Sequence, residues 1–383
     1  MCIFINNTAK GNGGAVWWNS TNGIITDSTF ISNTASWGSL SWRSTNGKLV
    51  NCYFINNTAS GGSGGVDWTG ANGNLTNCYF INNTAGSGGG LSLNAVNSTM
   101  FNCTFIGNTA TSYGGAVYWY SAGSVTNCTF IGNTATSQGG ALLWSGVNGT
   151  LSDSIFTDNN ASQGGALLWS GANGMITNSI FTSNTVKNWN GGGGILLNGD
   201  NSIVNNCTFI NNAATTDGGA ITWLANNGIL NDSTFISNTA TFEGAGVWWH
   251  GANGTLSSSI FTDNNANRNG GAVYWDGVNG ILSNSTFKGN FARSSGGAIY
   301  WQGISGNIIA CNFTSNIAND NGGCIYWTGT NSTIFDCNFT NNYAKNGDNV
   351  WRRWTVEEFL NKYSQINDHD YVWIYNGVGT PNS

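Results

Sequence analysis

The 383-residue sequence predicts an all-β fold, a right-handed parallel β-helix (solenoid) of about 13 coils with ~26 residues each. Three features predict it. A Phe-x-x-Asn motif recurs every 24 to 28 residues. Between its copies, apolar and polar residues alternate over segments of three to five residues, which are too short for helices and typical of strands. Proline, which cannot complete the hydrogen bonds of an interior strand, occurs once, at Pro381.

Each repeat carries the same three parts. Asn follows every motif Phe by three residues, a Gly-Gly-Ala-like turn such as Gly139-Gly140-Ala141 comes next, and an Asn-Gly turn such as Asn148-Gly149 follows. So short a unit cannot bury its apolar side alone. The repeats must therefore stack at the parallel-strand spacing of roughly 4.8 Å, as a rod on the order of 60 Å long. The motif Phe residues are Phe4, Phe30, Phe54, Phe80, Phe105, Phe130, Phe156, Phe181, Phe209, Phe235, Phe261, Phe287, Phe313 and Phe339.

Residues 139–159 illustrate the expected strands. Leu142 and Trp144 are predicted to face inward on a first strand, Leu151 on a second and Phe156 on a third. In the other repeats, the positions of Leu142 and Leu151 are aliphatic, the position of Trp144 is mostly Trp and the position of Phe156 is Phe. The inward and outward columns are therefore distinct in the sequence. The Asn after each Phe is predicted to form a ladder of side-chain amides along the stack, at a turn where Asn tolerates unusual backbone angles.

Composition restricts the partners. The chain is 40% hydrophobic but only 7% charged, with a net charge of −6 and no run of Lys or Arg. This argues against nucleic acid and anionic membrane surfaces as partners. No stretch approaches the roughly 20 apolar residues of a transmembrane segment. The first residues, Met1–Asn7, lack the pattern of an export signal and resemble the middle of a repeat, so we expect part of a longer surface protein.

Eight of the nine cysteines occupy one column, two residues before the motif Phe, where other repeats have Ser, as at Ser154. Thiols in one parallel column point the same way, which suits neither a disulfide nor a tetrahedral metal site. We therefore predict buried free thiols, no metal and no cofactor. Cys324, in the Ala position of a Gly-Gly turn, is the exception. The column contains Cys2, Cys52, Cys78, Cys103, Cys128, Cys207, Cys311 and Cys337.

Most carboxylates fit turns better than catalysis. Asp158 and Asp263 are expected to be exposed and lie four coils apart, too far for the paired carboxylates of glycoside hydrolysis. A further set occupies a bend column otherwise filled mostly by Asn, which predicts turn formers. The bend-column residues are Asp27, Asp153, Asp232 and Asp336.

One local cluster of charged residues stands out. His250 and Asp276 follow the Trp column on adjacent coils and should be neighbours, with Glu243 and Arg268 on turns nearby. Such a group suits acid–base catalysis, but a surface ion pair explains it as well. We favour the ion pair and predict no catalytic residue.

An outward aromatic column is the candidate binding site. Trp248, Tyr274, Tyr300 and Tyr326 lie between the aliphatic and Trp columns on four successive coils. Stacked, exposed rings of this kind mark interaction surfaces, including sugar-binding ones. Two alternatives remain: the rings stabilise one another along the sheet, or a loop covers them.

The repeat pattern stops near residue 350, which predicts a β-helix repeat domain over residues 1–350. Residues 351–383 form either a small α+β cap or the truncated start of a further domain. Thr355–Glu358 is a capping box, apolar residues at helical spacing follow it, and Tyr371–Tyr375 reads as a strand. A solenoid needs its open end covered.

The pairing of Gly-Gly-Ala-[Ile/Leu/Val] with Phe-x-x-Asn resembles the repeat of chlamydial polymorphic outer-membrane proteins. It is also similar to the Asn/Thr-rich repeats of adhesin-like surface proteins of methanogenic archaea. The resemblance covers roughly residues 1–350 and implies an exported β-helix displayed on a cell surface, with a role in adhesion. Frequent Asn-x-Ser/Thr sequons, such as Asn82-Asn83-Thr84, are compatible with a glycoprotein.

These observations favour a non-catalytic, secreted or cell-surface protein: an adhesin or structural stalk. It would bind glycans, or surface proteins of a host or neighbouring cell, along the aromatic face. The alternative is a polysaccharide lyase or hydrolase, because pectin-degrading enzymes share the pectin lyase-like fold. Repeats of nearly constant length leave no long loop to wall a catalytic groove, which disfavours that alternative.

Overall fold

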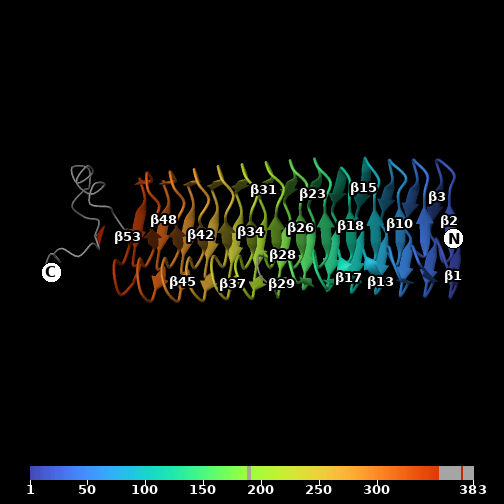
Figure 1. The fold of residues 1–383 in the computed structure, drawn as a ribbon, viewed down its shortest axis with the longest axis horizontal. Helices are drawn as coiled ribbons and strands as arrows, with labels where there is room; N and C mark the ends of the chain where they lie inside the picture. The colour runs from blue at the N-terminus through green and yellow to red at the C-terminus, as the bar shows by residue number, and fades with distance from the viewer. Residues whose placement is uncertain (188–190, 353–371, 374–383) are drawn as a thin grey trace.

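The structure, a computed structural model, describes residues 1–187, 191–352 and 372–373. The described chain forms a straight rod of stacked coils, with strands running across the rod axis (Figure 1). All strand pairs are parallel and join one coil to the next, as the motif spacing predicts. The predicted right-handed β-helix is confirmed, and the described residues contain strands and turns but no helix.

Four parallel sheets line the rod. We call three of them the phenylalanine, aliphatic and tryptophan sheets after their buried residues, and the fourth the corner sheet. The phenylalanine sheet has 14 strands from β1 (Ile3–Ile5) to β52 (Asn338–Thr340). The aliphatic sheet has 13, from β3 (Ile24–Thr26) to β51 (Thr333–Phe335). The corner sheet has 12 short strands, from β5 (Thr34–Ala35) to β49 (Ile317–Ala318).

The tryptophan sheet has 15 strands and carries the candidate site. Its strands are β2 (Val16–Trp18), β6 (Leu40–Trp42), β10 (Val66–Trp68), β14 (Leu91–Leu93), β18 (Val117–Trp119), β22 (Leu142–Trp144), β26 (Leu167–Trp169), β30 (Ile195–Leu197), β34 (Ile221–Trp223), β38 (Val247–Trp249), β42 (Val273–Trp275), β46 (Ile299–Trp301), β50 (Ile325–Trp327), β53 (Val350–Arg352) and β54 (Val372–Trp373).

The corner sheet corrects the expected count of three strands per coil. A fourth strand follows the ladder Asn, as in β21 (Thr134–Ala135). Most of its members have two residues, which is too short for an apolar–polar alternation to appear in the sequence.

The predicted inward columns form the core. Leu142, Trp144, Leu151 and Phe156 are all fully buried. The motif Phe rings stack without interruption from Phe4 to Phe339, with centroids 4.5 to 5.2 Å apart. Offset-stacked rings add to the stability from area burial, so each coil is held in register by its neighbours.

The Asn ladder is confirmed, with one correction to its explanation. The backbone N–H and Nδ2 of Asn159 both donate to Oδ1 of Asn184, at 3.0 and 2.9 Å, and Nδ2 also donates to the carbonyl of Phe130. Asn159 is fully buried. The left-handed backbone lies one residue earlier, at Asp158 with φ 56°. The ladder position therefore needs a primary amide for its hydrogen bonds, and its neighbour tolerates the strained angle.

The cysteines are free thiols, as predicted, and most are buried. Burial raises the pKa of Cys207 to about 12. In the same column, the Ser154 hydroxyl donates to the carbonyl of Ser152 and accepts the N–H of Cys128. The column thus selects a small side chain that can donate to the bend beneath it, and both Ser and Cys can do so. Cys324 is also fully buried.

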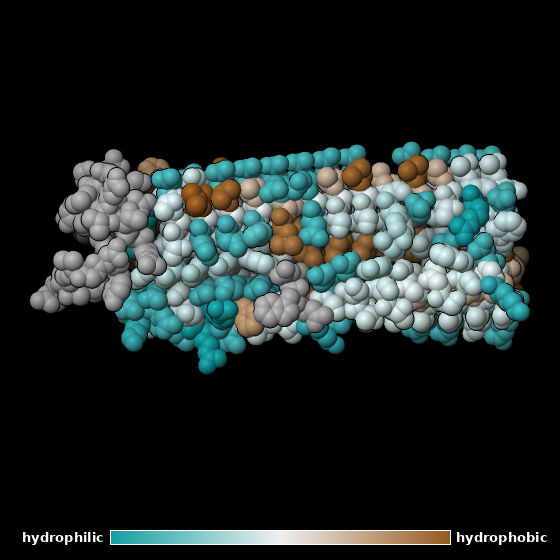
Figure 2. All heavy atoms as spheres, in the orientation of Figure 1, coloured by the Kyte–Doolittle hydropathy of each residue, from teal (hydrophilic) through white to brown (hydrophobic). Residues whose placement is uncertain are grey.

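The bend-column acids are turn formers, as expected. Asp27, Asp153, Asp232 and Asp336 all have positive φ, between 48° and 54°. Hydrogen bonds, chiefly from Asn51, lower the pKa of Asp27. Asp158 and Asp263 are exposed at turns. Figure 2 agrees with this surface: hydrophilic residues form long rows on the rod, and apolar groups form small, separate patches.

At the C-terminal end, the tryptophan sheet continues through β53 and β54, which pair in parallel. The predicted capping box and helix, and the rest of the strand 371–375, lie outside the described residues. The boundary at residue 350 therefore stays a prediction. Within the described ranges, no helix is long and apolar enough to span a membrane.

Candidate functional site

The site is built on the outer column of the tryptophan sheet, meaning the central residue of each of its strands. Along the rod this column contains segments of different character. Ser41, Asp67 and Ser92 are polar yet buried, and the leucines of β22, β26 and β30 form a small apolar cluster of their own. An aromatic segment follows. Its members are Trp248, Tyr274, Tyr300, Tyr326 and Trp351.

Four rings of the aromatic segment, from Tyr274 to Trp351, form a stack, whereas the Trp248 ring is tilted against His250 with centroids 5.9 Å apart. Ring centroids lie 4.9 Å apart for Tyr274–Tyr300, 4.6 Å for Tyr300–Tyr326 and 4.5 Å for Tyr326–Trp351, with planes within 19° of parallel. The rings are half-buried, whereas the sequence suggested exposed rings. In-register parallel pairing places each ring above the next. The result is a rigid aromatic strip with one side open to solvent.

Sequence reasoning missed Trp351 in this stack. Its segment lacked the repeat motif and was interpreted as the end of the pattern. The pairing of Tyr326 with Trp351 shows that the column continues for one more coil. Aligning the central residue of each strand, and not the motif, would have found it.

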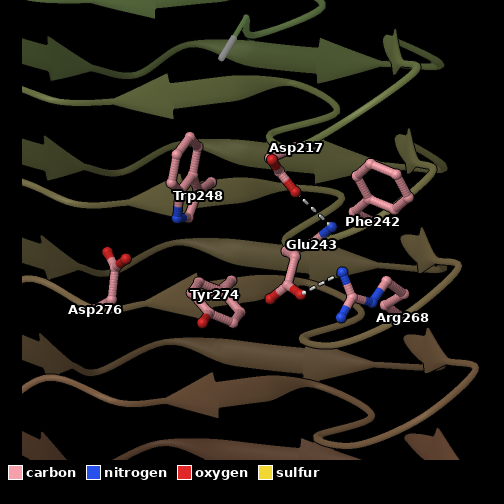
Figure 3. Close-up of a pocket in the computed structure, with 7 residues that line it drawn as sticks. All are labelled: Asp217, Phe242, Glu243, Trp248, Arg268, Tyr274 and Asp276. Carbon is pink, nitrogen blue, oxygen red and sulfur yellow. Dashed lines mark hydrogen bonds and ion pairs between the residues drawn. The ribbon is translucent and has the colours of Figure 1, made fainter. Parts of the chain in front are cut away.

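A pocket of about 170 Å³ lies at the other end of the aromatic segment (Figure 3). Asp217 and Glu243 come from the turns that precede β34 and β38, and Asp276 follows β42 directly. Figure 3 shows the Tyr274 ring between the carboxyl groups of Asp276 and Glu243. The lining residues are Asp217, Phe242, Glu243, Trp248, Arg268, Tyr274 and Asp276.

Glu243 has few partners for a carboxylate that is only 15% exposed. Its Oε1 accepts a hydrogen bond from Asn269 at 3.2 Å and lies 3.7 Å from Nη1 of Arg268. Its Oε2 is buried and has no hydrogen-bond partner among the described residues. The Glu243 backbone N–H donates to Oδ1 of Asp217 at 3.0 Å, which ties two acidic turns together.

Burial is the main cause of unusual pKa values in this pocket. It raises the pKa of Glu243 to about 7, and the charges of Asp217 and Asp276 raise it further, against Asn269 and Arg268, which lower it. Burial also raises the pKa of Asp217, of Asp276 and of the Tyr274 hydroxyl. The pocket thus holds three carboxyl groups for which ionisation is costly.

The predicted cluster does assemble, although His250 stands beside the pocket. Its Nδ1 lies 3.1 Å from both oxygens of Asp276, and its side chain is 60% exposed. Glu243, Arg268 and Asp276 line the pocket and His250 does not. Asp217 was not among the predicted site residues, although it occupies the same turn position as Glu243 one coil earlier. Comparing this turn position between adjacent repeats would have identified it.

The same outer column holds a second ionic contact near the N-terminus. Nη2 of Arg43 lies 2.6 Å from Oδ2 of the buried Asp67. A few coils further on, Tyr118 contacts Tyr120 at 3.8 Å and Tyr113 at 5.8 Å, measured between ring centroids. These residues belong to the same face but do not line the pocket.

Searches against known proteins support the fold. The Chlamydia polymorphic membrane protein repeat matches residues 1–17, which confirms the resemblance in repeat type. No curated protein sequence matches the chain.

Solved structures resemble it distantly. The tailspike protein of E. coli bacteriophage HK620 in complex with pentasaccharide is 14% identical, with 87% of this chain and 65% of that chain covered and a TM-score of 0.47. A mutant of this tailspike in a pentasaccharide complex is 13% identical, with 81% of this chain and 60% of that chain covered and a TM-score of 0.45. This chain therefore spans less than two thirds of that protein. A mannuronic acid specific polysaccharide family 6 lyase from human gut microbiota is 10% identical, with coverages of 100% and 92% and a TM-score of 0.38.

The family model described as a right-handed β-helix region matches this chain twice, over residues 89–241 and 177–314. Together these matches span more than half of the sequence. They agree with the stacked parallel sheets of the structure. The chain therefore belongs to the right-handed β-helix family.

Proposed function

We propose that the protein is a non-catalytic, surface-displayed rod that binds glycans along the aromatic segment of the tryptophan sheet. The stack Tyr274, Tyr300, Tyr326 and Trp351 carries this proposal. A nearly uncharged surface rich in Asn, Ser and Thr, together with the repeat type, favours display outside the cell as an adhesin or stalk.

The geometry of the stack suits an extended polymer. Successive rings lie 4.5 to 4.9 Å apart, so a chain lying along the rod meets a ring at each coil. Because the ring faces cover one another, the stack presents a continuous row of ring edges to a sugar chain, and the rings lose little side-chain freedom on binding because stacking already fixes them. Tyr274 Oη donates to Gln302 Oε1 at 2.8 Å, which fixes its ring further.

The test is retention of the purified protein on a panel of immobilised neutral and acidic polysaccharides. Replacing Tyr274, Tyr300 and Tyr326 with Ser should weaken binding by at least about tenfold, since each ring contributes on the order of 1 kcal/mol. The matched control is Tyr53→Ser with Tyr79→Ser, a stacked pair at 4.8 Å on the outer face of the phenylalanine sheet. Equal binding by both variants and the wild type would contradict the proposal.

A polysaccharide hydrolase or lyase is the second candidate, and Glu243 is the observation that favours it. A carboxyl group with a pKa of about 7 beside two others is a usable general acid. The pocket volume of about 170 Å³ is small for a catalytic cleft. Release of reducing or unsaturated ends from the same panel, abolished by Glu243→Gln, would favour catalysis; retention without product favours binding.

A further inference from the structure

We propose that the pocket beside Tyr274 binds a primary ammonium group, so that the groove selects glycans with free amino sugars over N-acetylated, neutral or acidic ones. This inference rests on the proposed glycan-binding function. It assigns the acidic end of the aromatic segment a role in specificity that the rings alone cannot have, since every sugar presents C–H groups.

The charge balance of the pocket favours a cation. Three carboxyl groups, those of Asp217, Glu243 and Asp276, line it with a single guanidinium, that of Arg268, while the exposed His250 contacts Asp276 from beside the pocket. The Arg268 side chain is 59% exposed, lies 3.7 Å from Glu243 and is positioned over the Phe242 ring at 5.5 Å. An exposed ion pair at this distance compensates little of the buried negative charge.

The Glu243 carboxyl group has one oxygen without a donor. Oε2 of Glu243 is buried without a hydrogen bond, which is costly for a carboxylate oxygen. A bound ammonium supplies three donors and one positive charge to a pocket lined by carboxyl groups. A neutral hydroxyl supplies one donor and no charge, and an acetamido group places a methyl where the charge is needed.

The aromatic walls favour an organic cation over a metal ion. Trp248 and Tyr274 line the same pocket, and ring faces attract ammonium groups through their quadrupoles. No group of three or more His, Cys, Asp or Glu among the described residues is arranged to hold a metal ion. The acidic groups flank a ring instead of converging on one point, as Figure 3 shows for Asp276, Tyr274 and Glu243.

The position of the pocket links it to a sugar chain. Tyr274 belongs both to the pocket and to the stack that continues through Tyr300 and Tyr326. A sugar unit packed on Tyr274 would place one ring substituent in the pocket. A volume of about 170 Å³ admits such a substituent but not a whole branched sugar.

The experiment is isothermal titration of the full chain with three hexamers: glucosamine, N-acetylglucosamine and glucose. The glucosamine hexamer should bind about tenfold more tightly than the others, the gain expected from one desolvated cation–π and ion-pair contact. Glu243→Gln should remove this preference, so that the variant binds the three hexamers with similar affinity. Asp153→Asn is the matched control: it removes the same charge from a bend column where Asn is common, distant from the pocket.

The outcomes separate the two proposals. If the N-acetylated or glucose hexamer binds and glucosamine binds no more tightly, the ammonium site is wrong and glycan binding stands. If Asp153→Asn lowers glucosamine binding as much as Glu243→Gln does, the preference reflects net charge, which also overturns the site. If no hexamer binds, both proposals fail for these sugars. The wild-type comparison of ligands needs no variant, so poor folding of Glu243→Gln would not leave the site untested.

Discussion

Two buried carboxylates on one face of the rod have opposite surroundings. Asp67 in β10 has Arg43 in direct contact at 2.6 Å, and the side chains are only 6% and 26% exposed. Glu243, before β38, has Arg268 at 3.7 Å, and that arginine is mostly exposed. The first carboxylate has a close ion-pair partner within the chain, although its Oδ2 makes no regular hydrogen bond; the second lines a pocket, and its Oε2 has neither a hydrogen bond nor an ion-pair contact among the described residues.

The difference teaches that burial alone does not make a site. Burial raises the pKa of both carboxyl groups. Arg43 opposes that rise for Asp67 through its charge and a hydrogen bond. For Glu243, Asn269 and the more distant Arg268 oppose the rise, whereas the charges of Asp217 and Asp276 add to it. A carboxylate with an internal counter-ion is structural, and one surrounded by further carboxylates offers its binding capacity to a ligand.

Breaking the Asp67 pair should have the largest effect on stability. Arg43→Met leaves a buried carboxylate without its counter-ion, and we expect a loss of about 4 kcal/mol in the free energy of unfolding at neutral pH. Urea denaturation, followed by circular dichroism, measures it.

A double variant, Arg43→Leu with Asp67→Leu, sharpens this test. The same column carries Leu at Leu143, Leu168 and Leu196, so the sheet accommodates that side chain there. Stability should return to within about 1 kcal/mol of wild type. A double variant as unstable as Arg43→Met would show that packing, and not the unpaired charge, causes the loss.

Glu243→Gln should change the pH dependence of stability. Below pH 4.5 the Glu243 carboxyl is protonated in both folded and unfolded chains. Between pH 4.5 and about 7 the folded chain binds the extra proton, so wild-type stability falls as pH rises, and it levels off above. The variant lacks this loss and should be more stable than wild type at pH 8 by up to about 3 kcal/mol.

The measurement compares urea midpoints of the two proteins across this pH range. Equal midpoints at all pH values would mean that Glu243 titrates as a solvated group. The contrast between the surroundings of Glu243 and those of the buried Asp67 would then be wrong.

Arg268→Met should have the smallest effect. An exposed ion pair contributes little, so the free energy of unfolding should change by less than about 0.5 kcal/mol. Because Arg268 lowers the pKa of Glu243, its removal should raise the midpoint of the Glu243 titration, which NMR of the side-chain carboxyl carbon can follow. A stability loss as large as that of Arg43→Met would contradict the distinction between the two pairs.

The repeat spacing was enough to predict the coil number and the inward columns, because every coil must place the same residue type above the last. Phe130 and Trp144 illustrate this. Each is constrained by the ring of the next coil, so its periodicity is visible in the sequence. The sequence also brought His250, Asp276, Glu243 and Arg268 together correctly, since in-register stacking turns a spacing of one repeat into contact.

Strand spacing could not reveal which outward residues are buried. Leu143 and Asp67 occupy the outer column and are nevertheless buried, Leu143 in a small apolar cluster on that face and Asp67 against Arg43.

The sequence by itself determined the fold, the register and the aromatic column of this protein, because stacking repeats periodic contacts that any one coil displays. Only the tertiary structure decided that the column ends in an acidic pocket and that Oε2 of Glu243 lacks a partner. Burial and charge compensation depend on the distances between side chains from different turns, and no periodicity of the chain encodes those distances.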